Sequence, residues 1–221
     1  MNNRLNKNIF ISLVGVLFLF LTSSISAQKA FEGKIKIKLS SDNQTILMNY
    51  YIKDKNLKME LSNREENGSF IMKGKNYLVL LPAQKMYMEI SSEMLKNLPE
   101  MKPTENTNRD NKIDINKFRT GKTKKILGYN CEQWIINNKD GNMEIWVTNE
   151  LGNFITMDGP MGKVYSPAWS TYLQNNGFFP MKVISNNGKS VFEVIEVDKK
   201  SLSDAIFSPP SNYKKMTIPG M

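Results

Sequence analysis

The sequence predicts a mainly β fold, in which about ten antiparallel strands form a curved sheet or half-barrel with two short helices on its concave face. Three observations support this prediction. Short segments alternate apolar and polar residues with the period of two that is typical of strands with one buried face. The breaks between these segments are short and rich in Asn, Asp and Gly, as in antiparallel turns. Only two segments, both short, place apolar residues at helical spacing.

The first 27 residues have the three regions of a secretory signal peptide. Arg4 and Lys7 make a positively charged start, residues 9–21 are almost entirely apolar, and residues 22–27 are mostly small. The apolar run is shorter than the roughly 20 residues that span a membrane, and no cysteine near Ala27 offers a site for a lipid anchor. We therefore expect cleavage after Ala27, a single domain over residues 28–221, no stable membrane anchor and a periplasmic or secreted location.

The first half of the domain reads as a meander of six strands. In the clearest of them, Phe31–Leu39, the odd-numbered residues are Phe, Gly, Ile, Ile and Leu, and the even-numbered residues are charged. The expected strands are 31–39, 45–53, 56–61, 68–73, 76–81 and 85–90. A short helix is expected over Ser91–Leu98, where Pro99 would stop it, and the polar segment 102–116 is expected to be a flexible loop.

The second half resumes with five further strands, expected at 118–127, 131–137, 143–148, 179–185 and 191–197. Asp140-Gly141 and Asn187-Gly188 are the strongest hairpin signals in the chain. Between these hairpins, Ser166–Leu173 is expected to form the second helix, with Ser166 as its cap and Pro167 at its first position. The two halves are expected to share one sheet, because neither contains enough apolar residues for a core of its own.

The composition argues against several kinds of chemistry. The chain contains no histidine, and Cys131 is its only cysteine, so histidine-activated nucleophiles and intramolecular disulfides are excluded. We expect Cys131 to be a buried core residue. The formal net charge is +9, or +7 once Arg4 and Lys7 leave with the signal peptide; no nucleic-acid motif accompanies it. We expect a non-enzyme with no cofactor, no metal and no nucleic-acid partner.

Two tryptophans are candidates for a binding pocket. If Asp140-Gly141 makes a hairpin, we expect Trp134 and Glu132 to share a sheet face with Trp146 and Glu144. Such a group would line a pocket for an apolar ligand with a polar tip. Two alternatives remain open: ordinary packing with the carboxylates in solvent, and general acid–base catalysis by the two glutamates as in glycosidases.

Further candidate ligand contacts come from three other segments. Met86 and Met88 share a strand face, and methionine adapts to varied apolar partners; core filling and Cu(I) binding are the alternatives. Phe154 lies in a glycine-rich stretch, 151–162, that is expected to act as a lid. Trp169 lies on the apolar face of the second helix. Lysines cluster over residues 112–125, either protecting a sheet edge or contacting lipid headgroups or an acidic partner.

One sequence motif links the chain to a known family. The segment Gly121–Trp134, GKTKKILGYNCEQW, resembles a motif of an exported bacterial family, domain of unknown function 4412. Three later segments resemble that family in the same order: Glu144–Trp146, Gly177–Pro180 and Phe207–Tyr213. The family is similar, more distantly, to the half-barrel of LolA-type lipoprotein carriers. The resemblance implies that fold and the holding of apolar ligands, and it supplies no catalytic residues.

These observations lead to two functional expectations. The first is a soluble, exported, non-catalytic protein that binds a lipid or another apolar ligand in a half-barrel cavity, with contacts from Trp134, Trp146, Met86, Met88, Phe154 and Trp169. The alternative is an envelope module that binds another protein and has no ligand cavity.

Overall fold

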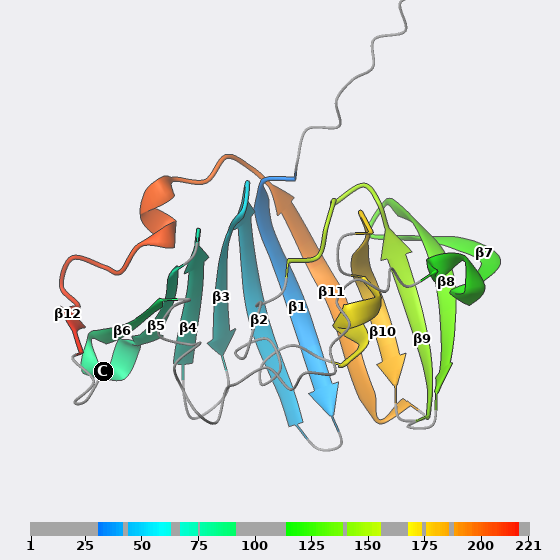
Figure 1. The fold of residues 1–221 in the computed structure, drawn as a ribbon, viewed down its shortest axis with the longest axis horizontal. Coiled ribbons are helices and arrows are strands. Elements are labelled where there is room, and N and C mark those ends of the chain that lie inside the picture. The colour runs from blue at the N-terminus through cyan, green and yellow to red at the C-terminus, as the bar shows by residue number, and fades with distance from the viewer. Residues whose placement is uncertain are drawn as a thin grey trace, which may run out of the picture.

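The computed structural model describes residues 31–41, 44–62, 67–74, 76–91, 114–138, 141–155, 168–173, 176–185 and 188–216. Twelve strands of these residues form one sheet (Figure 1). The first six are β1 Gly33–Ser41, β2 Gln44–Lys53, β3 Asn56–Ser62, β4 Asn67–Lys73, β5 Asn76–Leu81 and β6 Met86–Ser91. The others are β7 Arg119–Ile126, β8 Tyr129–Asn138, β9 Gly141–Thr148, β10 Phe179–Ser185, β11 Ser190–Lys199 and β12 Lys214–Lys215.

The sheet consists of two meanders that meet at β1 and β11. The strand order is β12-β6-β5-β4-β3-β2-β1-β11-β10-β9-β8-β7. Antiparallel pairing joins every pair of neighbours except β12 and β6, which are parallel. The β1–β11 junction runs from Gly33 opposite Lys199 to Ser41 opposite Ser190, with a bulge after Lys36. The two halves therefore form a single sheet, as the sequence predicts.

The predicted strands are confirmed, each within two residues of its expected ends. Both hairpin predictions are confirmed as well, since β8 pairs with β9 and β10 pairs with β11. The two-residue strand β12 was not predicted. It carries only two lysines, and it forms because the backbone amide of Lys214 donates to the carbonyl of Lys85 at 2.9 Å.

The helical elements differ from the predictions. Within the helix expected over residues 166–173, Ala168–Tyr172 form a short 3-10 helix, η4. The expected cap Ser166 and first position Pro167 lie outside the described residues. The expected helix over 91–98 lies outside the described residues after Ser91, which ends β6. The expected loop over 102–116 is described only from Asp114. There Asp114 caps a second 3-10 helix, η3 Ile115–Phe118, by accepting a hydrogen bond from the Asn116 amide at 3.1 Å.

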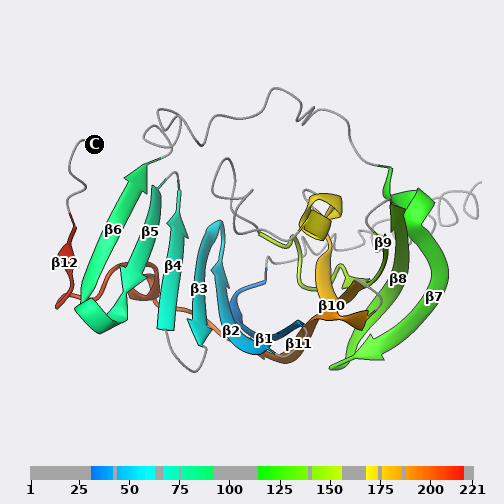
Figure 2. The same ribbon diagram turned by 90° about the horizontal axis from the view of Figure 1, so that it is seen from below.

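The sheet is strongly curved, and η4 lies inside the curve (Figure 2). The main hydrophobic core lies on this concave face. Ile35, Ile37 and Tyr50 of the central strands are fully buried there. Phe154, which follows β9, and Trp169 of η4 pack over them in the same cluster. Among the described residues, no helix is long and apolar enough to cross a membrane.

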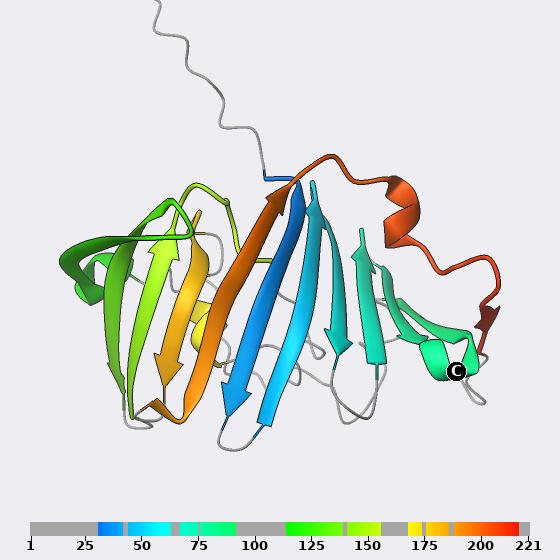
Figure 3. The ribbon, with the colours of Figure 1, turned by 180° about the vertical axis from the view of Figure 1, so that it is seen from behind.

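A C-terminal strap, residues 200–216, crosses the convex face of the β3–β6 half (Figure 3). Phe207, in the 3-10 helix η6 Asp204–Phe207, is fully buried against Ile71 and Leu80. This packing explains why β4 and β5 are buried on both faces, a pattern that differs from the simple alternation of β1.

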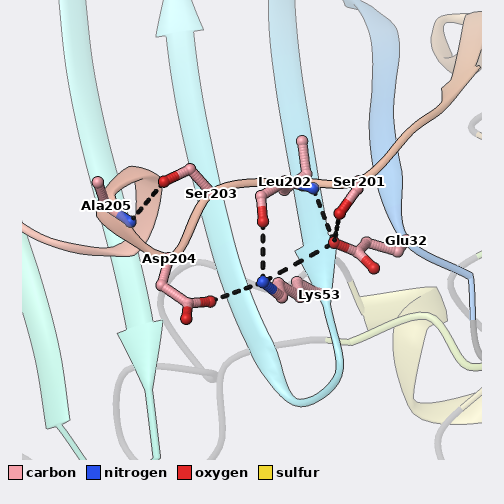
Figure 4. A network of polar contacts seen from close by, with 7 residues as sticks. All are labelled: Glu32, Lys53, Ser201, Leu202, Ser203, Asp204 and Ala205. Atoms are coloured by element: carbon pink, nitrogen blue, oxygen red, sulfur yellow. Dashed lines mark hydrogen bonds and ion pairs between the residues drawn. The ribbon is translucent and has the colours of Figure 1, made fainter.

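A polar network fixes the start of the strap beside β1 and β2 (Figure 4). The Lys53 ammonium donates to the Leu202 carbonyl at 2.8 Å and forms an ion pair with Asp204 at 2.8 Å. The Glu32 carboxylate accepts a hydrogen bond from the Leu202 amide at 2.7 Å. Because both partners of Leu202 are charged, these hydrogen bonds are of the stronger kind, and they hold Leu202 in its buried position.

Candidate ligand-binding site

A pocket of about 210 Å³ lies at the end of the sheet where β1, β2, β10 and β11 finish or begin. Its apolar lining consists of Leu39, Ile46, Trp169, Val183, Val191 and Phe192. Its polar lining consists of Ser40, Ser41, Gln44, Ser185 and Ser190. No charged side chain occurs among the described residues that line it.

The register of the four strands produces two rows of side chains on one face. Leu39 lies opposite Ile46 on one side and Phe192 on the other. Phe192 in turn lies opposite Val183, which completes an apolar row across the four strands. Because side chains two positions apart share a strand face, the next row toward the strand ends projects on the same side. That row is polar: Gln44, Ser41, Ser190 and Ser185.

Trp169 supplies the wall of the pocket that does not belong to the sheet. Its ring contacts Phe192 edge to face, with the centroids 5.1 Å apart. It also stacks on Phe154 at 5.6 Å. Only 7% of Trp169 is exposed, so its position is determined by these aromatic contacts. Of the six predicted ligand contacts, Trp169 is the one that lines this pocket.

Phe154 lies behind Trp169 and links it to the central strands. Its ring stacks on Tyr50 at 5.6 Å, and its amide donates to the Phe178 carbonyl at 3.1 Å. The hydroxyl of Tyr50 donates to the carbonyl of Ile155 at 2.5 Å. Burial raises the pKa of Tyr50 well above its usual value, so the hydroxyl stays protonated as a donor. Of the segment 151–162, which the sequence predicts to act as a lid, the structure describes residues 151–155. These two hydrogen bonds, to Tyr50 and Phe178, attach that part to the sheet.

The prediction that Trp134 and Trp146 share a sheet face is wrong. Trp134 lies opposite Ile145, and Trp146 lies opposite Gln133. In a hairpin with a two-residue loop, the numbers of two paired residues always add to an odd sum, so an even-numbered residue pairs with an odd-numbered one. Two even-numbered residues on the two strands therefore lie on opposite faces, whichever two residues form the loop. Glu132 and Glu144 are separated in the same way, which removes the geometry for joint acid–base catalysis.

Each tryptophan instead forms a hydrogen bond with the glutamate on its own strand. Trp134 is fully buried on the concave face, and its indole N–H donates to Glu132 at 2.8 Å. Trp146 lies on the convex face, where its N–H donates to Glu144 at 2.5 Å and the Lys124 ammonium sits 3.8 Å from its ring centroid. Although burial opposes the effect, hydrogen bonds from Gln133 and Trp146 lower the pKa of Glu144.

The remaining candidates lie away from the pocket. Met86 and Met88 are half-buried on β6, opposite Leu81 and Val79 of β5. Four strands separate β6 from β1 in the sheet, so the methionine pair does not contribute to this site. Cys131 is 1% exposed, and burial raises the pKa of its thiol, which confirms its assignment to the core.

The basic cluster lies on an edge of the sheet. Its lysines at 122, 124 and 125 are exposed on β7, which ends the strand order on one side. The opposite edge, β12, consists of Lys214 and Lys215, both exposed. Lysine on both edges is the arrangement that discourages edge-to-edge association of sheets. Among the described residues, no group of three or more His, Cys, Asp and Glu is placed to hold a metal ion.

Comparison with known proteins identifies the family. The profile of the Domain of unknown function (DUF4412) family matches residues 31–213, so the chain belongs to this family. A search of curated proteins gave no match. Among solved structures, an uncharacterized conserved protein from Thermus thermophilus is similar, with a TM-score of 0.51 and 10% identity over 93% of this chain and 98% of that one. This similarity shows the fold alone.

A weaker match is to PNGF-II, solved in C2 and P21 crystal forms, with a TM-score of 0.36 and 17% identity. It covers 85% of this chain and 31% of PNGF-II.

Proposed function

We propose that this member of the DUF4412 family is an exported, non-catalytic protein that binds a small apolar ligand with a polar end in the pocket beside Trp169. The two rows of side chains carry this proposal. An apolar row of Ile46, Leu39, Phe192 and Val183 lies deeper in the pocket, and a polar row of serines and Gln44 lies at the strand ends. Ligand sites commonly combine an apolar lining with a few polar groups that fix the orientation. Export rests on the signal-peptide pattern of residues 1–27.

The volume limits the size of the ligand. The pocket measures about 210 Å³. An apolar cavity of about 150 Å³ is large enough for benzene, and pockets for drug-sized molecules begin at about 300 Å³. The ligand is therefore a single ring, a short alkyl chain or the end of a longer chain. A lipid would enter with one chain, and the rest of the molecule would remain outside.

The walls of the pocket are largely preformed. Leu39, Ile46, Val183 and Phe192 project from four strands that are joined by backbone hydrogen bonds. Such walls need little ordering when a ligand binds, which favours affinity. Trp169 is the exception, because it comes from η4 and is held by ring contacts. We expect this residue to respond most to a bound ligand.

Isothermal titration calorimetry with 1-octanol tests the proposal. The alcohol has one alkyl chain and one polar end, and we expect saturable binding at one site. Ile46→Trp places a larger side chain in the pocket and should abolish binding. Leu47→Trp is the matched control, since Leu47 lies next to Ile46, on the other face of β2, and is 38% exposed.

Far-ultraviolet circular dichroism and the midpoint of urea unfolding should show that both variants retain the fold of the wild type. No binding of 1-octanol to the wild-type protein would overturn the proposal. Equal binding to a folded Ile46→Trp variant would place any site elsewhere and would also overturn it.

A further inference from the structure

We propose that the pocket selects ligands whose polar end is uncharged and can both donate and accept a hydrogen bond, such as an alcohol or a primary amide, over ligands that end in a carboxylate. This inference rests on the proposed function and specifies the chemistry of the ligand. It is drawn from three features of the site: the hydrogen-bonding character of the polar row, the placement of the nearby charges, and the half-buried position of two of the serines.

The polar row offers both donors and acceptors. A serine hydroxyl has one donor and two acceptor positions, and the amide of Gln44 has both kinds of group. A neutral hydroxyl or amide on the ligand also has both kinds, so it can donate to one row member and accept from another. A carboxylate only accepts, and it would leave the acceptor positions of the row without a partner from the ligand.

The charged side chains that flank the apolar row in the register of these strands project from the other face. Lys38 and Lys182 both form ion pairs with Glu193, each at 2.9 Å. These three residues lie opposite one another across β1, β11 and β10, in register positions that alternate with Leu39 and Phe192. Each lysine therefore already has a carboxylate partner, and neither projects into the pocket. Lys189, which precedes Ser190, is exposed to water, where its field is screened.

The partly buried positions of Ser185 and Ser190 determine how much binding free energy a charged ligand end would lose there. Both residues are partly buried, whereas Ser41 and Gln44 are exposed. A carboxylate between Ser185 and Ser190 would lose part of its water shell without meeting a cation from the described residues that line the pocket, and uncompensated desolvation disfavours the charged form. Water still reaches the outer half of the row, so the desolvation of a carboxylate is incomplete. We therefore expect the neutral ligand to bind about tenfold more tightly than the carboxylate, a smaller difference than a fully buried site would give.

The net charge of the protein acts in the opposite direction. The formal charge of +9 for the whole chain attracts anions at long range. Salt weakens that attraction between exposed charges much more than it changes local desolvation. The preference for a neutral end should therefore be measured at physiological ionic strength, and it should increase as salt is added.

The test compares 1-octanol, octanamide and octanoate in calorimetric titrations of the full mature chain at neutral pH. We expect the two neutral compounds to bind about tenfold more tightly than octanoate. Gln44→Lys adds a cation to the polar row and should improve octanoate binding several-fold. Thr45→Lys is the matched control, because Thr45 is also exposed but belongs to the other face of β2; it adds the same net charge and should leave the preference unchanged.

The outcomes separate this inference from the proposed function. Octanoate binding as tightly as 1-octanol to the wild type would overturn the inference and leave the proposed function in place. An equal gain for octanoate in Gln44→Lys and Thr45→Lys would also overturn it, because net charge alone would then explain anion binding. If none of the three compounds binds, both proposals fail.

Discussion

Replacing Tyr50 by phenylalanine tests how the segment that supports Trp169 is held to the sheet. Tyr50 is fully buried, and its hydroxyl donates to the Ile155 carbonyl at 2.5 Å across 105 positions of sequence. Tyr50→Phe keeps the ring that stacks on Phe154 and removes only the hydroxyl. The Ile155 carbonyl then loses its side-chain donor.

The expected loss of stability follows from removing the hydroxyl that donates to the Ile155 carbonyl. A buried acceptor that loses its donor costs about 1–3 kcal/mol, and this range is the upper bound here because Ile155 is only partly buried. If residues 151–155 open locally, the same free energy appears as faster exchange of the Phe154 amide, which donates to the Phe178 carbonyl. At about 1.4 kcal/mol for each factor of ten, the exchange rate should rise by about fivefold to a hundredfold.

Native-state hydrogen exchange, read at the Phe154 amide by NMR, measures this effect. Tyr51→Phe is the control, because Tyr51 is the next residue of β2 and donates instead to Glu60 at 2.9 Å. That variant loses a hydroxyl of the same kind without touching residues 151–155. Unchanged exchange at Phe154 in Tyr50→Phe, or equal acceleration in both variants, would refute the reasoning.

Three further predictions concern stability, and urea unfolding measures each. Gly33→Ala should lower the free energy of unfolding by about 1–3 kcal/mol, because a Cβ there would lie 2.3 Å from the Asp198 carbonyl oxygen. Gly68→Ala, whose Cβ would have nothing within 4 Å, should be nearly neutral. Equal effects of the two substitutions would contradict this explanation. Phe207→Ala should lower the free energy of unfolding by about 3–5 kcal/mol, since Phe207 of the strap is fully buried against the sheet. A loss below about 1 kcal/mol would show that the strap contributes little. Two lysines lower the pKa of Glu193, so the ionised carboxylate stabilises the fold above about pH 4.5, and this stabilisation is lost as the pH falls through the folded-state pKa. Glu193→Gln should therefore reduce the loss of stability in acid by less than about 1 kcal/mol. An unchanged dependence of the free energy of unfolding on pH would count against this prediction.

The strand pattern was predictable because each strand of the meanders is bounded locally. In β5, Asn76 and Leu81 are the observed ends and also the ends that the sequence indicates. Turn residues stop each run, and alternation separates its two faces. The same alternation failed to show that Leu78 and Leu80 are buried against the C-terminal strap. The strap contacts them from more than 100 positions away, and nothing local to β5 signals it.

The error over Trp134 and Trp146 has a different origin. Both residues were correctly placed on strands, and their hairpin was correctly predicted. The hairpin itself separates the two rings, because any two-residue loop between these strands places residues 134 and 146 on opposite faces. The sequence therefore contained the information needed to separate the tryptophans and the two glutamates, and with it the information against a shared carboxylate site.

The pocket itself depends on a contact that local patterns do not reveal. The hairpin of β1 and β2 and the hairpin of β10 and β11 are each predictable, yet the pocket exists only because β1 pairs with β11. That pairing brings Leu39 beside Phe192 and Ser41 beside Ser190, across about 150 residues of sequence. Its register decides whether the apolar rows of the two hairpins face the same side, because a slip of one residue would move one hairpin's row to the convex face. The bulge after Lys36 resets the register just before these pairs form, so the irregularity at the centre of the sheet is what aligns the two halves of the site.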